Sequence, residues 1–511
     1  MKQTYITTPI YYVNGNPHIG HAHTTVMGDI LKRCELMKGN EVFFSTGTDE
    51  HGQKNQSSAE KSGLPVDEYL TGQSNKFREL FEALHVSFDY FVRTTAPHHK
   101  ETVQYVLNTL KEKGLIVKKT YEGLYCEGCE MFKKKSDLDD KGNCPDHQAP
   151  PAQMTETNYF FKLAEHQEWL AAHIRENSDW IQPDIYHNEL LNMLKEPLED
   201  MCISRPKSRV SLGVELPFDS EYVTYVWFDA LINYISNIGY PGDMEKTNHW
   251  WPSAIHLMAK DIIKTHCIYW PIMLKALGMS MPQKYRVHGY WVAEGGIKMS
   301  KSLNNVVDPH EIIQIYGADT LRFYLAKSMG KSEAQISVKL VQECYQSDLG
   351  NNIGNLYLRV VKMVARHFDN KVPECQTPAP EDQALVSQVH ELALAAFPQN
   401  NLLSEINHLA KSVIAMGNAV NLHFDQTAPW VLAKDPEQKD RLVSVLYCCL
   451  ETLRMIFEVA YPIMPVTGNR ALAALGAKPI AEVPAEHRPE PYALTAGQSL
   501  GEAVVLFPKI E

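Results

Sequence analysis

The sequence predicts an α/β half followed by an α-helical half, with a cysteine-containing insertion inside the α/β half. Up to about residue 115, strand-like runs alternate with helical patterns, which is typical of a parallel sheet covered by helices. Two short cysteine and histidine pairs then interrupt the alternation, and beyond about residue 350 apolar residues recur every three or four positions. A chain of 511 residues exceeds what one hydrophobic core usually organises, so we expect about three or four domains.

The insertion divides the α/β half into two segments. We expect strands at 5–10, 41–45 and 254–257, helices at 20–37, 66–84 and 99–113, and renewed α/β character over 222–234. This order is typical of a nucleotide-binding Rossmann domain, whose ligands lie beyond the carboxyl ends of the strands. We therefore place the split Rossmann domain at 1–115 and 226–296, the insertion at 116–225, a lysine-loop region at 297–352 and a helical bundle at 353–511.

The first helix begins at a polar turn. Pro9 should end the pairing of the preceding strand, because it has no N–H to donate. After the turn, Asn16 is the expected N-cap and Pro17 the expected first helical residue. The helix then runs to about Gly39.

The most informative motif lies at that helix start: His18, Ile19, Gly20 and His21. His18 and His21 are three residues apart and share one face of the first turn. Unpaired N–H groups and the helix dipole attract phosphate there, and Gly20 leaves room for a flat base. Taken alone, the motif equally fits two incidental histidines at a polar helix start.

A second motif runs from Gly295 to Ser302 and contains Lys298 and Lys301. The pair Gly295 and Gly296 provides a hinge, and two lysines on a short loop can close on a polyphosphate. Taken alone, this motif would favour a solvated basic loop. Both motifs in one chain indicate the two sides of a split nucleotide site.

The insertion carries a predicted structural zinc site. Its four candidate ligands form two close pairs, Cys126 with Cys129 and Cys144 with His147. Two disulfides or free thiols are the alternative, but a histidine as the fourth group favours one tetrahedral Zn²⁺. Ten cysteines without a dense spacing framework also fit a reducing compartment.

The composition indicates a cytoplasmic globular enzyme. Hydrophobic residues make up 44% of the chain and charged residues 22%, and Met1 leads directly into the first strand without a signal segment. The longest apolar stretch, 442–465, contains Glu451, Arg454 and Glu458 and is a poor membrane span. A net charge of -12 argues against a nucleic-acid partner unless a local basic track binds it.

Further residues resemble those of a known family. They are 8–14 (TPIYYVN), 47–52 (GTDEHG), 227–230 (WFDA) and 260–262 (KDI), in addition to the two motifs. With them the chain resembles the class I aminoacyl-tRNA synthetases, whose HIGH and KMSKS motifs bind ATP, and within that class the methionyl-tRNA synthetase family. The resemblance implies activation of L-methionine by ATP and Mg²⁺ to methionyl-adenylate, then transfer to the 3′-terminal adenosine of tRNA(Met).

The resemblance also implies residue roles. Catalysis would rest on His18, His21, Lys298 and Lys301. ATP would be bound by His18, Gly20, His21, Asp261, Lys298, Met299, Ser300 and Lys301. Methionine would be bound by Ile10, Tyr12, Asp49, Trp227, Ala230, Leu231, Tyr234, Ile262, His266 and Trp270. The anticodon would be read by Asn355, Arg359 and Trp430 in the helical half, and the region 297–352 would contact the tRNA stem.

The sequence departs from the family at two positions and leaves alternatives open. Ala259 stands where relatives usually have glycine, and Thr265 stands where many have an aromatic residue, which puts that pocket wall in doubt. Another class I synthetase, for leucine, valine, isoleucine or cysteine, would share both motifs, although the first three normally carry a much larger editing insertion. A small-molecule nucleotidyltransferase and a noncatalytic tRNA-binding relative are further alternatives. The chain ends without the extra dimerising domain of some relatives, so we expect a monomer.

Overall fold

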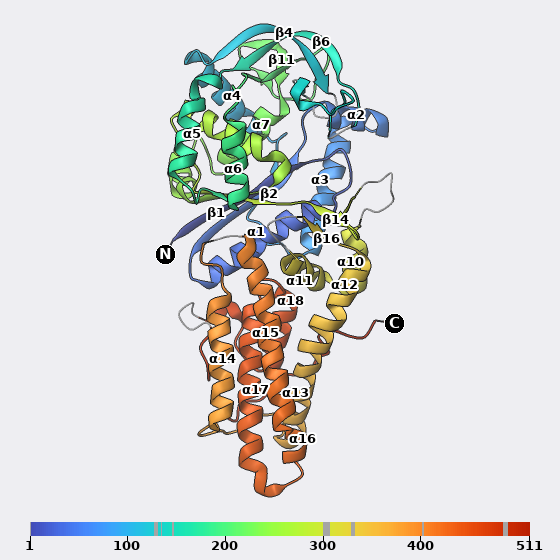
Figure 1. Cartoon of the computed structure of the whole chain (residues 1–511), viewed down its shortest axis with the longest axis vertical. Helices are drawn as coiled ribbons and strands as arrows, with labels where there is room; N and C mark the ends of the chain where they lie inside the picture. The colour runs from blue at the N-terminus through green and yellow to red at the C-terminus, as the bar shows by residue number, and fades with distance from the viewer. Residues whose placement is uncertain are drawn as a thin grey trace.

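The computed structural model describes residues 2–126, 131–133, 135–145, 148–299, 307–328, 333–400, 403–483 and 489–510. The molecule is elongated, with sheets and their covering helices at one end and a helical bundle at the other (Figure 1). Among the described residues, no helix has an apolar stretch long enough to cross a bilayer.

The α/β half is built on a six-stranded parallel sheet, as the sequence predicts. The strand order is β3-β2-β1-β12-β13-β7. The strands are β1 (Gln3–Tyr12), β2 (Glu41–Asp49), β3 (Tyr90–Arg93), β12 (Ala254–Ala259), β13 (Lys284–His288) and β7 (Ile181–Gln182). Strands β2 and β3 extend the sheet on one side of β1, and strands β13 and β7 extend it on the other side, beyond β12. Between β1 and β12 lies the switch point where such sheets bind ligands.

Each face of the sheet has its own apolar core. Ile6 and Ile255 pack into the core formed with α1 (Ile19–Met37), α3 (Val66–Ala83) and the helical bundle. Their neighbours Tyr5 and Ala254 pack into the other core, with α4 (Pro97–Glu112), α7 (Val226–Ser236) and α9 (Trp270–Leu277). Successive strand residues therefore bury opposite faces, which explains why these strands lack a polar side.

The structure corrects the prediction at the end of the first strand. Strand β1 does not stop at Pro9 but continues to Tyr12. Its pairing with β2 shifts register between Thr7 and Ile10, so Pro9 lies within an irregularity that does not need its missing N–H. The strand therefore carries its side chains past the proline to the carboxyl edge of the sheet.

The inserted segment forms small antiparallel sheets. One contains β4 (Ile116–Cys126), β5 (Met131–Lys133), β6 (Ala152–Phe161) and β8 (Met201–Cys202), and the other β9 (Ser204–Pro206), β10 (Glu215–Leu216) and β11 (Asp219–Thr224). Helices α5 (Gln167–Glu176) and α6 (Asp184–Met193) flank β7 in the chain. Because β7 pairs with β13, the segment 116–225 also completes the main sheet, which the sequence division does not anticipate.

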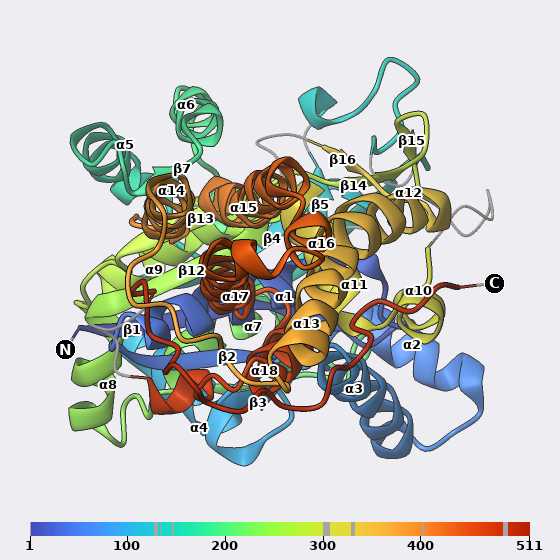
Figure 2. The same cartoon turned by 90° about the horizontal axis from the view of Figure 1, so that it is seen from below.

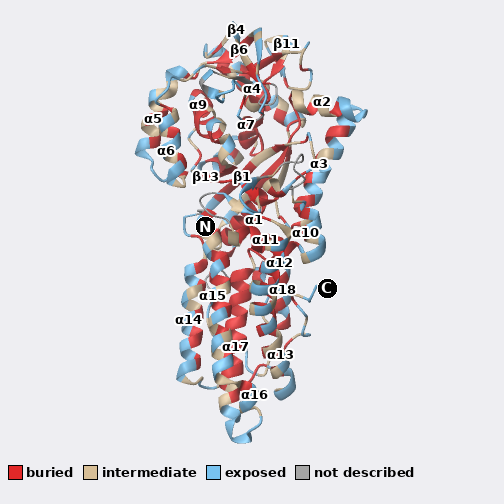
Figure 3. Cartoon of the chain, turned by 45° about the vertical axis from the view of Figure 1, so that its right-hand side comes forward, coloured by how far each residue is buried: buried red, intermediate tan, exposed pale blue. Residues whose placement is uncertain are grey.

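The second half is helical, as predicted. Its helices are α10 (Pro309–Tyr316), α11 (Ala318–Ser328), α12 (Val338–Cys344), α13 (Asn355–His367), α14 (Pro380–Ala396), α15 (Leu403–Thr427), α16 (Pro429–Leu432), α17 (Lys439–Ala460) and α18 (Pro465–Ala474). Figure 2 shows α17 in the middle, with α13, α14 and α15 around it. The stripe Ile406, Leu409, Val413, Met416 and Val420 of α15 is buried. Buried and exposed residues divide each outer helix lengthwise (Figure 3).

A buried arginine joins the two halves. Arg322 of α11 donates to Asp29 Oδ2 in α1 at 2.7 Å and to the Leu84 carbonyl at 3.0 Å. It also donates to the carbonyls of Pro462 at 2.8 Å and Ile463 at 2.7 Å, between α17 and α18. One guanidinium thus ties the helix that carries the first motif to the end of the bundle.

Candidate active site

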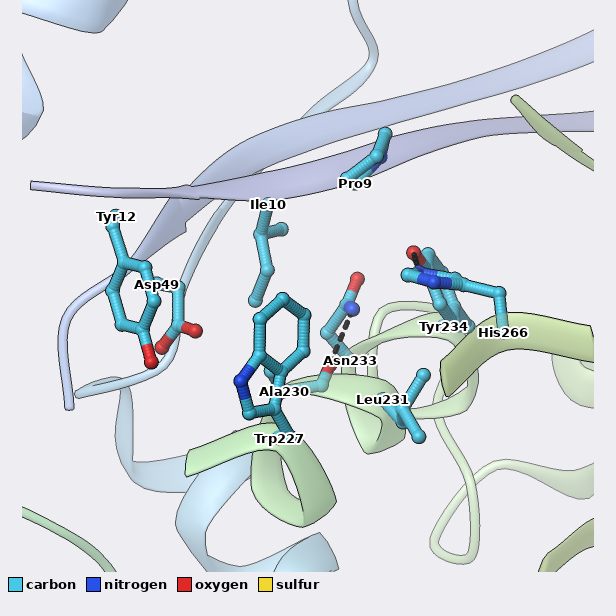
Figure 4. A pocket seen from close by; sticks show the side chains of 10 residues that line it. All are labelled: Pro9, Ile10, Tyr12, Asp49, Trp227, Ala230, Leu231, Asn233, Tyr234 and His266. Atoms are coloured by element: carbon cyan, nitrogen blue, oxygen red, sulfur yellow. Dashed lines mark hydrogen bonds between the residues drawn. The ribbon is translucent and has the colours of Figure 1, made fainter. Parts of the chain in front are cut away.

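A pocket opens at the carboxyl edge of the sheet, beside α7 (Figure 4). Its lining residues are Pro9, Ile10, Tyr12, Asp49, Trp227, Ala230, Leu231, Asn233, Tyr234 and His266. Eight of the ten residues predicted to bind methionine are among them. The other two, Ile262 and Trp270, are not: Trp270 is fully buried and donates to His256 Nε2 at 3.2 Å, which makes it part of the core behind the pocket.

Local structure explains why these side chains converge. Trp227, Ala230, Leu231 and Tyr234 follow one another at three- and four-residue helical spacing and so share one face of α7. The extension of β1 past Pro9 brings in Ile10 and Tyr12, which lie two residues apart on one side of the strand. Asp49 is the last residue of β2 and is only 4% exposed.

The pocket has one acidic group and a neutral polar pair. The carboxylate of Asp49 lies beside Tyr12 in Figure 4, where it can hold an ammonium group. Tyr234 and His266 lie at the other side, with the Tyr234 hydroxyl 2.7 Å from His266 Nε2. His266 Nδ1 lies 2.9 Å from the Ile262 carbonyl, which can only accept, so Nδ1 carries the hydrogen and Nε2 accepts from Tyr234.

Burial keeps this polar pair uncharged. It lowers the pKa of His266 to about 4 and raises the pKa of Tyr234 well above its ordinary value. Near neutral pH the pair therefore offers no charge to a ligand. An uncharged, polarizable side chain such as a thioether suits this environment.

The first motif caps its own helix, which corrects the predicted start at Asn16 and Pro17. His18 is the N-cap residue: its Nδ1 accepts from the Gly20 N–H at 3.1 Å. The Nδ1 of His21 accepts in turn from the His18 N–H at 3.2 Å. Because both Nδ1 atoms accept, the neutral rings carry their hydrogens on Nε2. The two rings stack with centroids 3.7 Å apart.

The surroundings of His21 favour its neutral form. Burial and the neighbouring His18 lower the pKa of His21 well below its ordinary value. His21 also packs against Tyr11 and Phe77, with ring centroids 4.7 Å and 5.1 Å away. A Cβ on Gly20 would approach the His18 ring to 3.1 Å, so glycine accommodates the stacked rings.

The second motif begins at a small sheet made of β14 (Trp291–Ala293), β15 (Ile297–Lys298) and β16 (Ala334–Gln335). Gly295 and Gly296 have φ angles of 86° and 79°, which suit glycine in the turn between β14 and β15. The Lys298 side chain, Ser300 and Lys301 lie outside the described residues, while Met299 packs against the apolar core.

A hydrogen bond connects the end of β13, just before β14, with α1, the helix that carries the first motif. His288 ends β13, and its Nε2 lies 2.8 Å from the hydroxyl of Thr24 in α1. Asp261 follows β12 in a short 3-10 helix, Lys260–Ile262, and is exposed. The predicted ATP residues that the structure describes thus come from the same edge of the sheet.

The two family departures lie outside the pocket lining. Ala259 ends β12 and is partly exposed. Thr265 begins the π-helix Thr265–Tyr269, whose second residue, His266, does line the pocket.

The predicted zinc site is described only in part. Cys126 ends β4 and Cys144 forms an isolated bridge with Ala149, and both thiols are buried. Cys129 and His147 lie outside the described residues. Within the described part of the chain, no three candidate ligands come together. Buried thiols at the two ends of the expected loop fit a structural metal.

Of the predicted anticodon residues, Asn355 and Arg359 lie on α13 and Trp430 lies on α16, which Figure 1 shows toward the end of the bundle away from the sheets. The Arg359 guanidinium lies 5.4 Å from the ring centroid of Trp430 and 4.7 Å from that of Phe424. Asn355 is exposed one turn earlier on α13. Trp430 is 41% exposed, so it is not a core aromatic and its ring is accessible to a base.

Sequence reasoning missed a buried network behind the pocket. Asp229 of α7 contacts His51 Nδ1 at 2.6 Å and His99 Nε2 at 2.8 Å. In the sequence, Asp229 stands out only as part of the motif 227–230. Partners 178 and 130 residues away leave no local signal.

Two family models match most of the chain. The family model described as "tRNA synthetases class I (M)" matches residues 4–154 and 147–361. The model described as "Anticodon binding domain of methionyl tRNA ligase" matches residues 372–511.

Individual relatives cover nearly all of the chain. A methionine–tRNA ligase of Clostridium tetani is 42% identical over 92% of this chain and 73% of its own length. One from Streptomyces coelicolor is 37% identical over 100% and 97%. The structure of Mycobacterium tuberculosis methionyl-tRNA synthetase in complex with methionyl-adenylate superposes with a TM-score of 0.93 at 32% identity, covering 100% of both chains. The chain therefore belongs to the methionyl-tRNA synthetase family of class I aminoacyl-tRNA synthetases.

Proposed function

We propose that the chain is a methionine–tRNA ligase, which activates L-methionine with ATP and transfers it to tRNA(Met). The pocket at the switch point of the sheet carries this proposal, because it places one carboxylate opposite a neutral aromatic and imidazole pair. That arrangement suits an amino acid with an uncharged, sulfur-containing side chain. The methionyl-adenylate complex of the tuberculosis relative supports the same chemistry.

Activation needs positioning and charge stabilisation from the protein. Asp49 holds the ammonium group of methionine, so that the carboxylate of methionine faces the α-phosphorus of ATP. A carboxylate oxygen bonds to that phosphorus as the bond to the β-phosphate bridge breaks, and pyrophosphate leaves. His18 and His21 donate from Nε2 to the phosphates, and Lys298 and Lys301 stabilise the leaving charge. Mg²⁺ accompanies ATP and shares that charge.

Transfer follows at the carbonyl carbon of methionyl-adenylate. The terminal ribose hydroxyl of tRNA attacks this carbon and forms the ester bond, while the bond from the carbon to the bridging oxygen breaks. AMP leaves with that oxygen, and the hydroxyl proton passes to the departing phosphate or to solvent. No side chain of the protein forms a covalent bond in either step. Asp261 is the proposed ligand of the ATP ribose.

Amino-acid-dependent ATP–pyrophosphate exchange with all twenty amino acids tests the proposal. Methionine should give at least about 100-fold higher kcat/KM than any other, which corresponds to about 3 kcal/mol of discrimination. Exchange with a different amino acid would identify another synthetase. Absence of exchange with all twenty would favour a noncatalytic tRNA-binding relative.

The zinc site is part of the proposal and predicts a metal content. Cys126→Ser should lower bound zinc from about one ion per chain to near zero, because a tetrahedral site that loses a thiolate binds metal much more weakly. Elemental analysis of the dialysed protein measures this. Cys375→Ser, a partly exposed cysteine outside the insertion, is the control and should keep its zinc. Equal zinc content in Cys126→Ser and wild type would refute the site.

A substitution among the anticodon residues is expected to affect tRNA charging but not methionine activation. Trp430→Ala should lower kcat/KM for tRNA(Met) charging about 5- to 150-fold, since stacking of a base on an aromatic ring contributes about 1–3 kcal/mol. Methionine-dependent exchange should not change, because it needs no tRNA. Val431→Ala, at the exposed neighbouring residue, is the matched control. Equal losses in charging and exchange would contradict the assignment of Trp430 to tRNA.

The remaining assignments are also proposals. We assign 1–115 and 226–296 to the catalytic domain, 116–225 to the insertion, 297–352 to the KMSKS-loop and stem-contact region, and 353–511 to anticodon binding. The chain acts as a monomer in the cytoplasm, where translation takes place. A molar mass in solution above 58.0 kDa per particle would contradict the monomer.

A further inference from the structure

Two opposite faces of helix α7 carry different sets of side chains. Its pocket face carries Trp227, Ala230, Leu231 and Tyr234. The opposite face carries Asp229 and, seven residues later, Ser236, which places both on one side of the helix, two turns apart. The side of α7 away from the pocket is therefore available to fix the position of the helix.

Asp229 connects this back face to two other elements. Its side chain is fully buried, and each carboxylate oxygen has its own imidazole partner: His51 Nδ1 at 2.6 Å on Oδ2 and His99 Nε2 at 2.8 Å on Oδ1. The other nitrogen of His99, Nδ1, lies 3.0 Å from Ser236 Oγ. His99 in α4 thus bridges both turns of α7.

The His51 side of the network leads directly to the predicted ammonium ligand. Asp49 and His51 are separated by one residue at the end of β2. Asn55 donates from its amide to both of their carbonyls, at 2.9 Å and 2.8 Å. The peptide that carries Asp49 is therefore held at His51 by Asp229 and at its carbonyls by Asn55.

The charge of Asp229 fits a clamp of this kind. Burial alone would raise its pKa, but charge and hydrogen bonds from His51 and His99 outweigh burial and lower the pKa to about 2. A carboxylate that stays ionised accepts from both imidazoles at once. An amide cannot do so, because its nitrogen only donates.

We propose that Asp229 is a positioning residue that sets the distance between Asp49 and the pocket face of α7. Asp49 fixes one end of the amino acid and α7 fixes the other, so their separation decides which side-chain length fits with the reacting carboxylate in place. This role rests on the proposed function, because it concerns the same methionine site. Asp229 touches no substrate and acts through His51.

Asp229→Asn tests the role in methionine-dependent ATP–pyrophosphate exchange. It should raise KM for methionine and lower kcat/KM for methionine about 10- to 100-fold, as expected for a displacement of about 1 Å in a positioned substrate. KM for ATP should stay within about twofold. A purely structural role would lower the folded fraction and reduce kcat with both KM values unchanged, and that result would overturn the proposal.

A double-mutant cycle with Asp49→Asn asks whether Asp229 acts through Asp49. If it does, the effect of Asp229→Asn should fall below about threefold in the Asp49→Asn background, because the group that it positions is gone. Full additivity of the two effects would contradict the proposed route.

Two further variants keep the test decisive. His99→Gln retains an N–H donor toward Asp229 and should change KM for methionine less than Asp229→Asn does; the reverse order would contradict the proposal. His99→Gln also replaces Asp229→Asn as the test variant if Asp229→Asn does not fold. Asp219→Asn, in an ion pair with Lys118 in the insertion, is the matched control and should keep the wild-type KM values. If wild type itself shows no methionine-dependent exchange, the proposed function fails; if wild type is active and Asp229→Asn matches it, only the positioning role fails.

Discussion

Replacing Asp49 by asparagine is expected to lower kcat/KM for methionine about 100-fold or more in ATP–pyrophosphate exchange. Asp49 is 4% exposed and is the acidic group among the lining residues of the pocket. Removing one partner of a buried, hydrogen-bonded charge pair costs about 2–5 kcal/mol, and each 1.4 kcal/mol corresponds to a factor of ten. The loss should appear mainly as a higher KM for methionine, because the ammonium group of the amino acid is the partner left unpaired.

Two measurements separate this effect from a general loss of activity. KM for ATP should stay close to the wild-type value in Asp49→Asn, since Asp49 is not among the residues proposed to bind ATP. Glu41→Gln, at the exposed opposite end of β2, neutralises another acid of the same strand and should leave exchange unchanged. An unchanged kcat/KM for methionine in Asp49→Asn would remove Asp49 from the site.

Replacing Arg322 by methionine is expected to destabilise the fold by about 3–5 kcal/mol, the usual result of breaking a buried ion pair from one side. The Arg322 side chain is fully buried and bonds to Asp29 and to carbonyls on both sides of the junction between the halves. The melting temperature should fall by about 5 °C, and protease should cleave between the sheet end and the bundle more readily. Arg366→Met, an exposed arginine of α13, is the control and should melt like wild type.

Acid unfolding gives an independent check on this junction. Burial alone would raise the pKa of Asp29, but Arg322 and Arg33 outweigh it and hold the pKa at about 2. The folded-state pKa is thus below the unfolded value of about 3.9, so the contribution is present above about pH 4 and is lost as the pH falls toward 2. In Arg322→Met, Asp29 keeps Arg33 and its hydrogen bonds from Ser87 but loses one of its two arginine partners, so the acid-unfolding midpoint should move to higher pH. An unchanged midpoint would mean that Asp29 does not depend on Arg322.

Features with a local cause are the ones that the sequence predicts well. The apolar stripe of α15 and the helical spacing from Trp227 to Tyr234 follow from neighbours three and four residues apart, and both appear as expected. Methionine specificity itself came from family resemblance, and its residue assignments stay predictions.

Features with a distant cause were missed. Strand β7 has only two residues, which is too short for an alternating pattern, and its pairing partner β13 lies about 100 residues further along the chain. The sequence predicts an N-cap at Asn16, a residue type that is common there, whereas two reciprocal hydrogen bonds between His18 and the first turn make His18 the N-cap. The partners of Asp229 come from β2 and α4, which meet α7 only after the sheet has formed.

The self-capping helix start has a consequence for how this motif can change over generations. His18 and His21 cap the start of α1 with one Nδ1 each, and the Nε2 of each ring is the proposed phosphate donor. A substitution at either position is therefore expected to fray the helix start and to remove a proposed phosphate donor in the same step. Because helix capping and the proposed phosphate binding depend on the same two side chains, neither function can be lost alone. We therefore expect the residues of this motif to be conserved together, and substitutions among them to occur only in relatives whose site is no longer active.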